Sequence, residues 1–178
     1  MSITREEQQS LFREFETPKH VQAHCNAVAR TAKRIAEALN EHGYHLDVDL
    51  IYGAALVHDV LRVQKEHDLR GAELLESRNH PEEADLVRMH MRYNPFSPAS
   101  DLHEIDILCL ADRTVLEDQF VGIDKRMDYL LQKKNFPEDK KPYIDIARQQ
   151  GLTFVHEIEE IIGMTLEELL RAEPETGE

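Results

Sequence analysis

The chain has 178 residues, 41% hydrophobic and 31% charged, with 21 Lys and Arg, 35 Asp and Glu, and a formal charge of −14. This composition predicts one globular domain rather than a disordered chain, and the charge argues against nucleic acid or an anionic membrane as a partner. No apolar run reaches the roughly 20 residues of a transmembrane helix. The N-terminal sequence MSITREEQQS lacks the apolar stretch of a secretory signal, so we expect a cytoplasmic protein.

Apolar residues recur every three or four positions along most of the chain, and no segment alternates with the period of a strand. We therefore expect an all-α fold, a single-domain helical bundle. Thr4 with Glu7 predicts a capping box that opens a first short helix. Thr17, as an N-cap followed by Pro18, predicts the start of a long second helix that ends at Gly43.

Later helices follow from further caps and breaks in the pattern. Asp47 predicts the N-cap of a third helix that continues through Leu61, and RYNPFSPAS, residues 92–100, predicts a loop. Other helices are expected over 68–77, 81–91 and 102–115, then from an N-cap at Asp124 to Ala172, with a second capping box at Thr165 and Glu168. We expect an N-terminal helix in 1–16, the domain core in 17–135, C-terminal helices packing on it in 136–172, and a disordered acidic tail in 173–178.

Cysteine and histidine usage separates ordinary residues from candidates. Cys25 and Cys109 match no disulfide framework or zinc motif, so we expect each to pack as a small buried hydrophobe. The chain also has ten histidines. Six of them have no special setting and are expected at the surface or at helix caps: His20, His42, His45, His80, His103 and His156.

Three polar residues lie on apolar helical faces. His24, His58 and Asp112 occupy positions where a buried, unpaired charge would cost several kcal/mol. Asp59 follows His58 about 100° further round the same expected helix, so both side chains can converge on one point. Two imidazoles and two carboxylates form a mixed nitrogen and oxygen site suited to Fe, Mn, Co, Ni or Zn. The alternative is that each is a hydrogen-bonded structural residue.

The helix with His24, the segment AALVHDVLR and the segment LCLADRTV, in that order, resemble the HD-domain superfamily of metal-dependent phosphohydrolases. The resemblance extends from about residue 18 to 130 and includes histidines in HDLRGAELL and VRMHM. It implies a first divalent metal ion on four residues: His24, His58, Asp59 and Asp112. It further implies that Asp59 bridges to a second ion held by His67 and His90.

Several of these positions have other interpretations. His67 can instead be a turn residue before a helix, and His90 can be favoured by the dipole at a helix C-terminus. Many family members follow His-Asp with an apolar residue, Gly and Lys, whereas here Val60, Leu61 and Arg62 follow. Arg62 keeps the positive charge, but Leu61 replaces the small residue, which leaves the substrate class open.

The resemblance implies hydrolysis of a phosphomonoester, a nucleotide or a related small phosphate by metal-activated water, with one or two divalent ions. Asp59 would be catalytic, and Arg62 and Arg113 would stabilise charge on the phosphoryl group. Arg126 is a further candidate, but ordinary surface ion pairing is the favoured interpretation for it and an equal one for Arg113. Two alternatives stay open: a nucleotide-sensing or regulatory module without turnover, and a protein similar to the di-iron oxygenases that HD-like folds also form.

Overall fold

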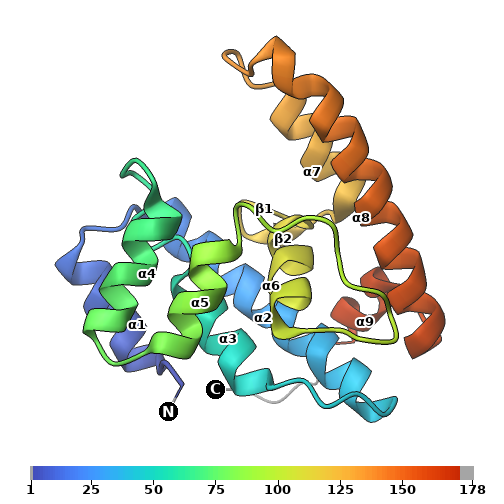
Figure 1. Ribbon diagram of the computed structural model, residues 1–178, viewed down its shortest axis with the longest axis horizontal. Coiled ribbons are helices and arrows are strands. Elements are labelled where there is room, and N and C mark those ends of the chain that lie inside the picture. Colours follow the sequence, from blue (N-terminus) through green and yellow to red (C-terminus); the bar gives the residue numbers. More distant parts are fainter. Residues whose placement is uncertain (1, 173–178) are drawn as a thin grey trace.

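The computed structural model describes residues 2–172, and the tail 173–178 predicted to be disordered lies outside the described residues. The regular secondary structure of the described part is helical apart from one small hairpin, which confirms the all-α prediction (Figure 1). Its elements are α1 Arg5–Glu14, α2 Lys19–Glu41, α3 Val48–Val57, α4 His67–Ser77, α5 Pro81–Met89, α6 Glu104–Asp112, β1 Val115–Leu116, β2 Gln119–Phe120, α7 Gly122–Leu131, the 3-10 helix η1 Glu138–Lys140, α8 Lys141–Ile162 and α9 Leu166–Arg171. None of the helices within 2–172 is both long and apolar enough to cross a lipid bilayer.

The centre of the fold is α2, which packs against both α3 and α6. Every residue of α6 from Ile105 to Ala111 is buried, so this helix is surrounded by protein on all sides. On the other flank α4 pairs with α5, and α5 packs on α3. We call this region, residues 2–121, the body. Its helices surround a core, and the side chains of His24, His58, Asp59 and Asp112 point into this core.

A second region projects from the body. We call residues 122–150 the arm: α7, η1 and the first part of α8, which lie side by side and extend away from the other helices (Figure 1). Gly151 marks its base, because a Cβ there would lie 2.9 Å from Cδ1 of Ile123 on α7. The absence of a side chain at Gly151 therefore permits the close approach of α7 and α8.

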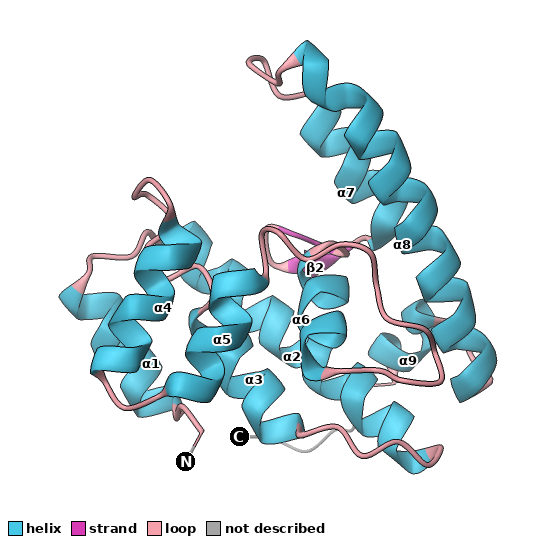
Figure 2. Cartoon of the chain, in the orientation of Figure 1, coloured by secondary structure: helices cyan, strands magenta, loops and turns pink. Residues whose placement is uncertain are grey.

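The loop between α5 and α6 connects the two regions. Figure 2 shows it crossing α6 toward α8, and it contains the loop predicted at residues 92–100. Asp106, which is fully buried, accepts hydrogen bonds from the Tyr93 hydroxyl at 2.8 Å and from the Ser97 backbone N–H at 2.8 Å. Phe96 stacks on Phe154 of α8 with ring centroids 4.2 Å apart. These contacts fix the loop as one wall beside the arm.

Several predicted helix ends are confirmed. Thr4 and Glu7 form the expected capping box at α1, as do Thr165 and Glu168 at α9. The Asp47 side chain caps α3 by accepting from the Leu50 backbone N–H. Thr and Asp residues therefore predicted helix N-termini correctly where the side-chain oxygen accepts a hydrogen bond from a backbone N–H in the first turn of the helix.

Two predicted N-caps are wrong. Pro18, not Thr17, is the N-cap of α2, and the Thr17 hydroxyl donates instead to the Val60 carbonyl at 2.8 Å. Asp124 lies inside α7, where it accepts from Arg148 of α8 at 2.8 Å. In both places a tertiary partner competes successfully for the side chain that local spacing assigned to a cap.

Three helices are shorter than expected, and one of them matters for the site. α5 ends at Met89 rather than at residue 91. α6 ends at Asp112, and Val115 belongs to the hairpin, where it pairs with Phe120. α3 ends at Val57, so His58 and Leu61 lie in a turn rather than on the helix.

The remaining cysteine and histidine expectations hold. Both cysteines are free and buried, and burial raises the pKa of Cys109 to about 12. Three of the six ordinary histidines are helix caps and three are exposed: His42, His80 and His103, then His20, His45 and His156.

Candidate metal centre

Six side chains predicted as metal ligands converge from separate elements of the body. Helices α2 and α6 each contribute one, the turn after α3 contributes two, and the start of α4 and the end of α5 contribute one each. In that order they are His24, Asp112, His58, Asp59, His67 and His90. The structure therefore brings the whole set together, whereas their role as ligands stays a prediction.

One group forms around Asp112. Nε2 of His24 lies 3.0 Å from Oδ1 of Asp112, and Nε2 of His58 lies 3.7 Å from the same oxygen. Each of the three residues offers a ligand atom within 4.8 Å of the others. This compact set of two imidazoles and one carboxylate could hold a metal ion.

A second group forms around Asp59. Its Oδ1 lies 3.1 Å from Nε2 of His67 and 3.6 Å from Nε2 of His90. Its other oxygen, Oδ2, lies 3.6 Å from Nε2 of His58. Asp59 thus has one oxygen on each side, which suits a carboxylate that bridges two ions.

Three of the histidines are oriented by the backbone. Their Nδ1 atoms each lie within hydrogen-bond distance of a carbonyl oxygen, which leaves Nε2 directed at the carboxylates. The pairs are His58 with Ala55 at 2.8 Å, His90 with Val87 at 2.6 Å and His24 with Glu117 at 3.0 Å. Metal-ligating histidines characteristically donate their other ring N–H in this way.

Nε2 of His58 and Nε2 of His90 are buried without a hydrogen-bond partner among the described residues. An unsatisfied buried polar atom costs roughly 1–3 kcal/mol. A divalent metal ion bound here would satisfy both lone pairs and neutralise Asp59. The residues present therefore fit a metal centre better than they fit a hydrogen-bonded structural network.

The ionisation of the centre follows from its close charges. Burial raises the pKa of Asp59, but neighbouring His58, His67 and His90 outweigh it, so the pKa lies well below its ordinary value. Burial likewise opposes ionisation of Asp112, and contacts with His24 and His58 lower its pKa well below the ordinary range. Both carboxylates are therefore ionised at neutral pH, as metal ligation requires.

His58 shifts in the opposite direction. Burial lowers its pKa, but the charge of Asp59 and the contact with Asp112 raise the pKa well above its ordinary value. In the metal-free protein these neighbours therefore favour the doubly protonated, cationic form of the imidazole. A metal ion must displace the proton on Nε2 to bind there.

The two arginines predicted to be catalytic lie differently. Nη1 of Arg62 is 3.5 Å from Oδ2 of Asp59 and 3.4 Å from Nε2 of His67, so it faces the centre. Arg113 donates to the Tyr93 carbonyl, and its guanidinium lies 5.1 Å from the ring centroid of Phe96. Arg113 is thus held in the wall of the site, and both catalytic roles stay predictions.

Two pockets open beside the centre. The larger, of about 580 Å³, lies between the α5–α6 loop and the arm and reaches His90 and Asp112. Many of its lining residues are apolar or aromatic: Met91, Tyr93, Met127, Leu130, Phe136, Tyr143 and Ile144. The smaller, of about 290 Å³, reaches His24 and Asp59. A ligand could therefore approach the predicted metal ligands from two sides.

An ion pair supports the histidines of the second group. Nε of Arg92, close after His90, lies 2.9 Å from Oδ2 of Asp68, which directly follows His67. Burial raises the pKa of Asp68, but Arg92 and backbone N–H groups lower it overall. The pair ties the start of α4 to the end of α5 and so keeps His67 and His90 close together.

Sequence reasoning missed some residues of this region. Tyr129 and Lys133 of the arm line the smaller pocket, and the Glu117 carbonyl orients His24. Arg126 does not form the favoured surface ion pair with any carboxylate of residues 2–172, and its Nε is buried without a partner there. Arg126 was a candidate from the sequence, but no local signal could have placed Tyr129, Lys133 or the Glu117 carbonyl, because each depends on where the arm and the hairpin lie relative to the body.

Comparison with known proteins supports one family. A family model described as HD domain matches residues 21–116, more than half of the chain. An uncharacterised protein of Methanocaldococcus jannaschii is 35% identical over 72 residues, which cover 39% of this chain and 43% of that relative. The match thus spans less than half of the relative's length. No solved structure matches the chain.

Proposed function

This chain belongs to the HD domain family, whose members bind divalent metal ions, and from that premise we propose that it is a metal-dependent phosphohydrolase. Its substrate would be a small phosphorylated molecule: a phosphomonoester, a nucleotide or a related phosphate. The proposal concerns this chain alone, because the archaeal relative is itself uncharacterised.

The observation that carries the proposal is the pair of unpartnered imidazole nitrogens. Nε2 of His58 and Nε2 of His90 are buried, have no hydrogen-bond partner within residues 2–172, and face the Asp59 carboxylate. A purely structural cluster would satisfy these atoms with donors or acceptors of its own. Their arrangement supports one or two divalent ions on the six predicted ligands, with Asp59 between them. Fe, Mn, Co, Ni and Zn all suit this donor set.

The residues around the centre suit a phosphoester. A divalent ion bound here supplies Lewis acidity, which lowers the pKa of water and withdraws charge from a phosphoryl oxygen. Arg62 faces the same point and can donate to phosphoryl oxygens as their charge increases. The larger pocket, next to His90 and Asp112, has room and apolar surface for the organic part of the substrate.

The test is phosphate release by protein loaded with Mn²⁺, Fe²⁺ or Co²⁺, using a panel of nucleotides and sugar phosphates. Asp59→Ala should abolish release, because both groups of histidines contact this carboxylate. Asp49→Ala is the matched control, since Asp49 is exposed on α3 and should leave the rate unchanged.

Other outcomes identify the alternatives. Tight nucleotide binding without turnover under every metal would contradict the proposal and indicate a sensing module. Oxygen consumption with a mixed-valence iron signal would contradict it in favour of di-iron oxygenase chemistry. Absence of any bound transition metal, before and after its addition, would overturn the ligand assignment itself.

A further inference from the structure

Three cations gather in the smaller pocket beside the metal centre. Arg62 comes from the turn after α3, Arg126 from α7 and Lys133 from the segment after α7, and together we call them the cation cluster. The same pocket of about 290 Å³ is lined by His24 and Asp59 of the centre. Its volume is several times the roughly 30 Å³ that a water molecule occupies in the liquid. A small anionic group therefore fits between the cluster and the predicted ligands.

The two arm cations share one aromatic ring. The guanidinium of Arg126 lies 5.8 Å from the ring centroid of Tyr129, and Nζ of Lys133 lies 5.2 Å from it. Within residues 2–172 neither cation forms an ion pair with a carboxylate, and Nε of Arg126 is buried without a partner. By contrast Arg148, also on the arm, lies 2.6 Å from a carboxylate oxygen of Asp128.

Such a cluster is unfavourable when empty. Burial, followed by the charges of Arg126 and Arg62, lowers the pKa of Lys133, because like charges close together disfavour the protonated form. Two carboxylates line the pocket, but Asp59 contacts the predicted metal ligands and Glu117 is exposed. Arg126 and Lys133 thus have no carboxylate partner within residues 2–172, and Arg62 has only Asp59, which the metal centre also uses. In a chain of formal charge −14, three cations gathered in this way indicate a binding site for an anion.

We infer, on the basis of the proposed function, that the cation cluster binds a second anionic group of the substrate, separate from the phosphoryl group that reacts at the metal centre. Arg62 and Arg126 line both pockets, so one molecule can place its organic part in the larger pocket and its second anionic group in the smaller. The substrate class is then an organic diphosphate or bisphosphate rather than a simple monophosphate.

The test compares two non-hydrolysable probes, methylphosphonate and methylenediphosphonate, by calorimetric titration of Mn²⁺-loaded protein. The full chain should prefer the diphosphonate. The double variant Arg126→Gln, Lys133→Gln should lose about tenfold or more of that preference, because charge-assisted contacts to the second group are removed. Its affinity for methylphosphonate and its metal content should be unchanged.

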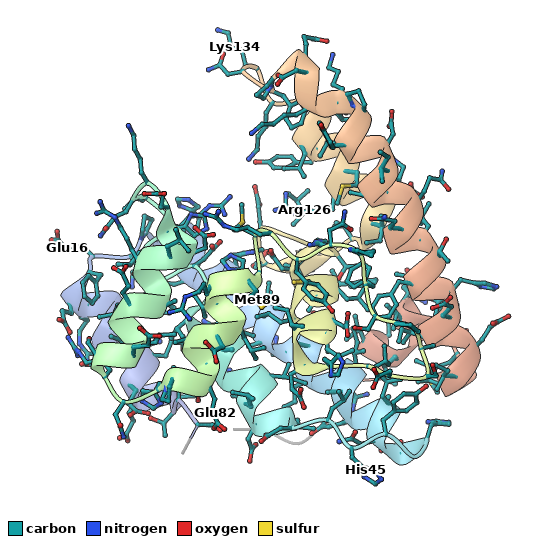
Figure 3. The ribbon with its side chains drawn as sticks, in the orientation of Figure 1. Glu16, His45, Glu82, Met89, Arg126 and Lys134 are labelled. Atoms are coloured by element: carbon teal, nitrogen blue, oxygen red, sulfur yellow. The ribbon has the colours of Figure 1, made fainter. Side chains whose placement is uncertain are left out.

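The control is Lys125→Gln, Lys134→Gln, which removes two exposed charges from the same part of the chain. Figure 3 shows Arg126 between the arm and the body, whereas Lys134 lies at the far end of the arm. The control should keep the full preference. A preference that survives in the cluster variant, or equal affinity for both probes in the unaltered protein, overturns the inference. Loss of preference in protein that hydrolyses no phosphoester supports the anion site and overturns the proposed function, so the two failures are distinguishable.

Discussion

In the body, α6 buries every residue from Ile105 to Ala111, whereas α8 has no buried residue before Gly151. Polar residues of the body and the arm differ in burial in the same way. His58 and Asp59 are buried in the body, while Tyr143 on the arm is 70% exposed. Residues buried on all sides can hold donor atoms at fixed separations, and exposed ones can adapt to a ligand.

This contrast indicates that the body binds metal and that the arm binds the ligand. All six predicted metal ligands belong to the body, and the arm contributes Arg126, Lys133 and apolar side chains to the two pockets. Substitutions of buried residues in the body should therefore remove metal or unfold the protein. Substitutions in the arm should change which molecules bind, with little effect on metal content or on the stability of the fold.

The largest effect is expected from removing a central ligand. His58→Ala leaves Asp59 and Asp112 buried without the imidazole between them, so metal affinity should fall at least about 100-fold, more than the loss of a supporting group. His156→Ala, at an exposed position of α8, is the control and should bind metal normally. Elemental analysis after dialysis measures both. Equal metal content in the two variants would contradict the assignment of His58 as a ligand.

A core substitution tests the same contrast through stability. Leu108 is fully buried in α6, so Leu108→Ala should lower the free energy of unfolding by about 2–5 kcal/mol. Ile146, 52% exposed on the arm, should cost no more than about 0.5 kcal/mol when replaced by Ala. Urea unfolding followed by circular dichroism measures both. A large loss at Ile146 would mean that the arm is covered in solution.

A smaller effect concerns pH. The pKa of His58 is raised well above 6.5, so metal binding must release its proton. Apparent metal affinity should fall by about tenfold for each pH unit below that raised pKa and level off above it. In the metal-free protein the protonated form contributes stability that is fully present below pH 6.5 and is lost as the pH rises through the raised value. Titrations in buffers of different ionisation enthalpy should show about one proton released, and no buffer dependence would contradict the assignment.

Much of the fold and part of the site were predictable from the sequence. The HD-family resemblance and the all-α fold are confirmed. His24 and Asp112 interrupt apolar helical faces, His58 directly follows the apolar face of α3, and the structure brings the three within one compact group. Their proximity could be expected because helical periodicity decides which face is buried, and a polar residue on or next to that face must meet partners in the core; their role as ligands stays a prediction.

The rest depended on tertiary contacts. Asp59 was expected one position further round a continuous helix, but α3 ends at Val57 and the turn carries Asp59 to its place among the histidines. The turn is held partly by the Thr17 hydroxyl, which bonds the Val60 carbonyl. Tyr129 and Lys133 line the pocket only because the arm projects from the body beside the metal centre. Spacing along one segment carries no information about such partners.

The hairpin after α6 has a consequence for how the chain tolerates changes in length. Asp112 ends α6, Glu117 in the hairpin turn orients His24, and Arg126 follows in α7, so one short stretch of chain supplies all three. Glu117 occupies the left-handed region with φ of 54° between two strands in fixed register. Insertion or deletion of a residue here would displace the carbonyl from His24 and change the strand register that sets where α7 begins, and with it the position of Arg126. We therefore expect this segment to vary in sequence more readily than in length.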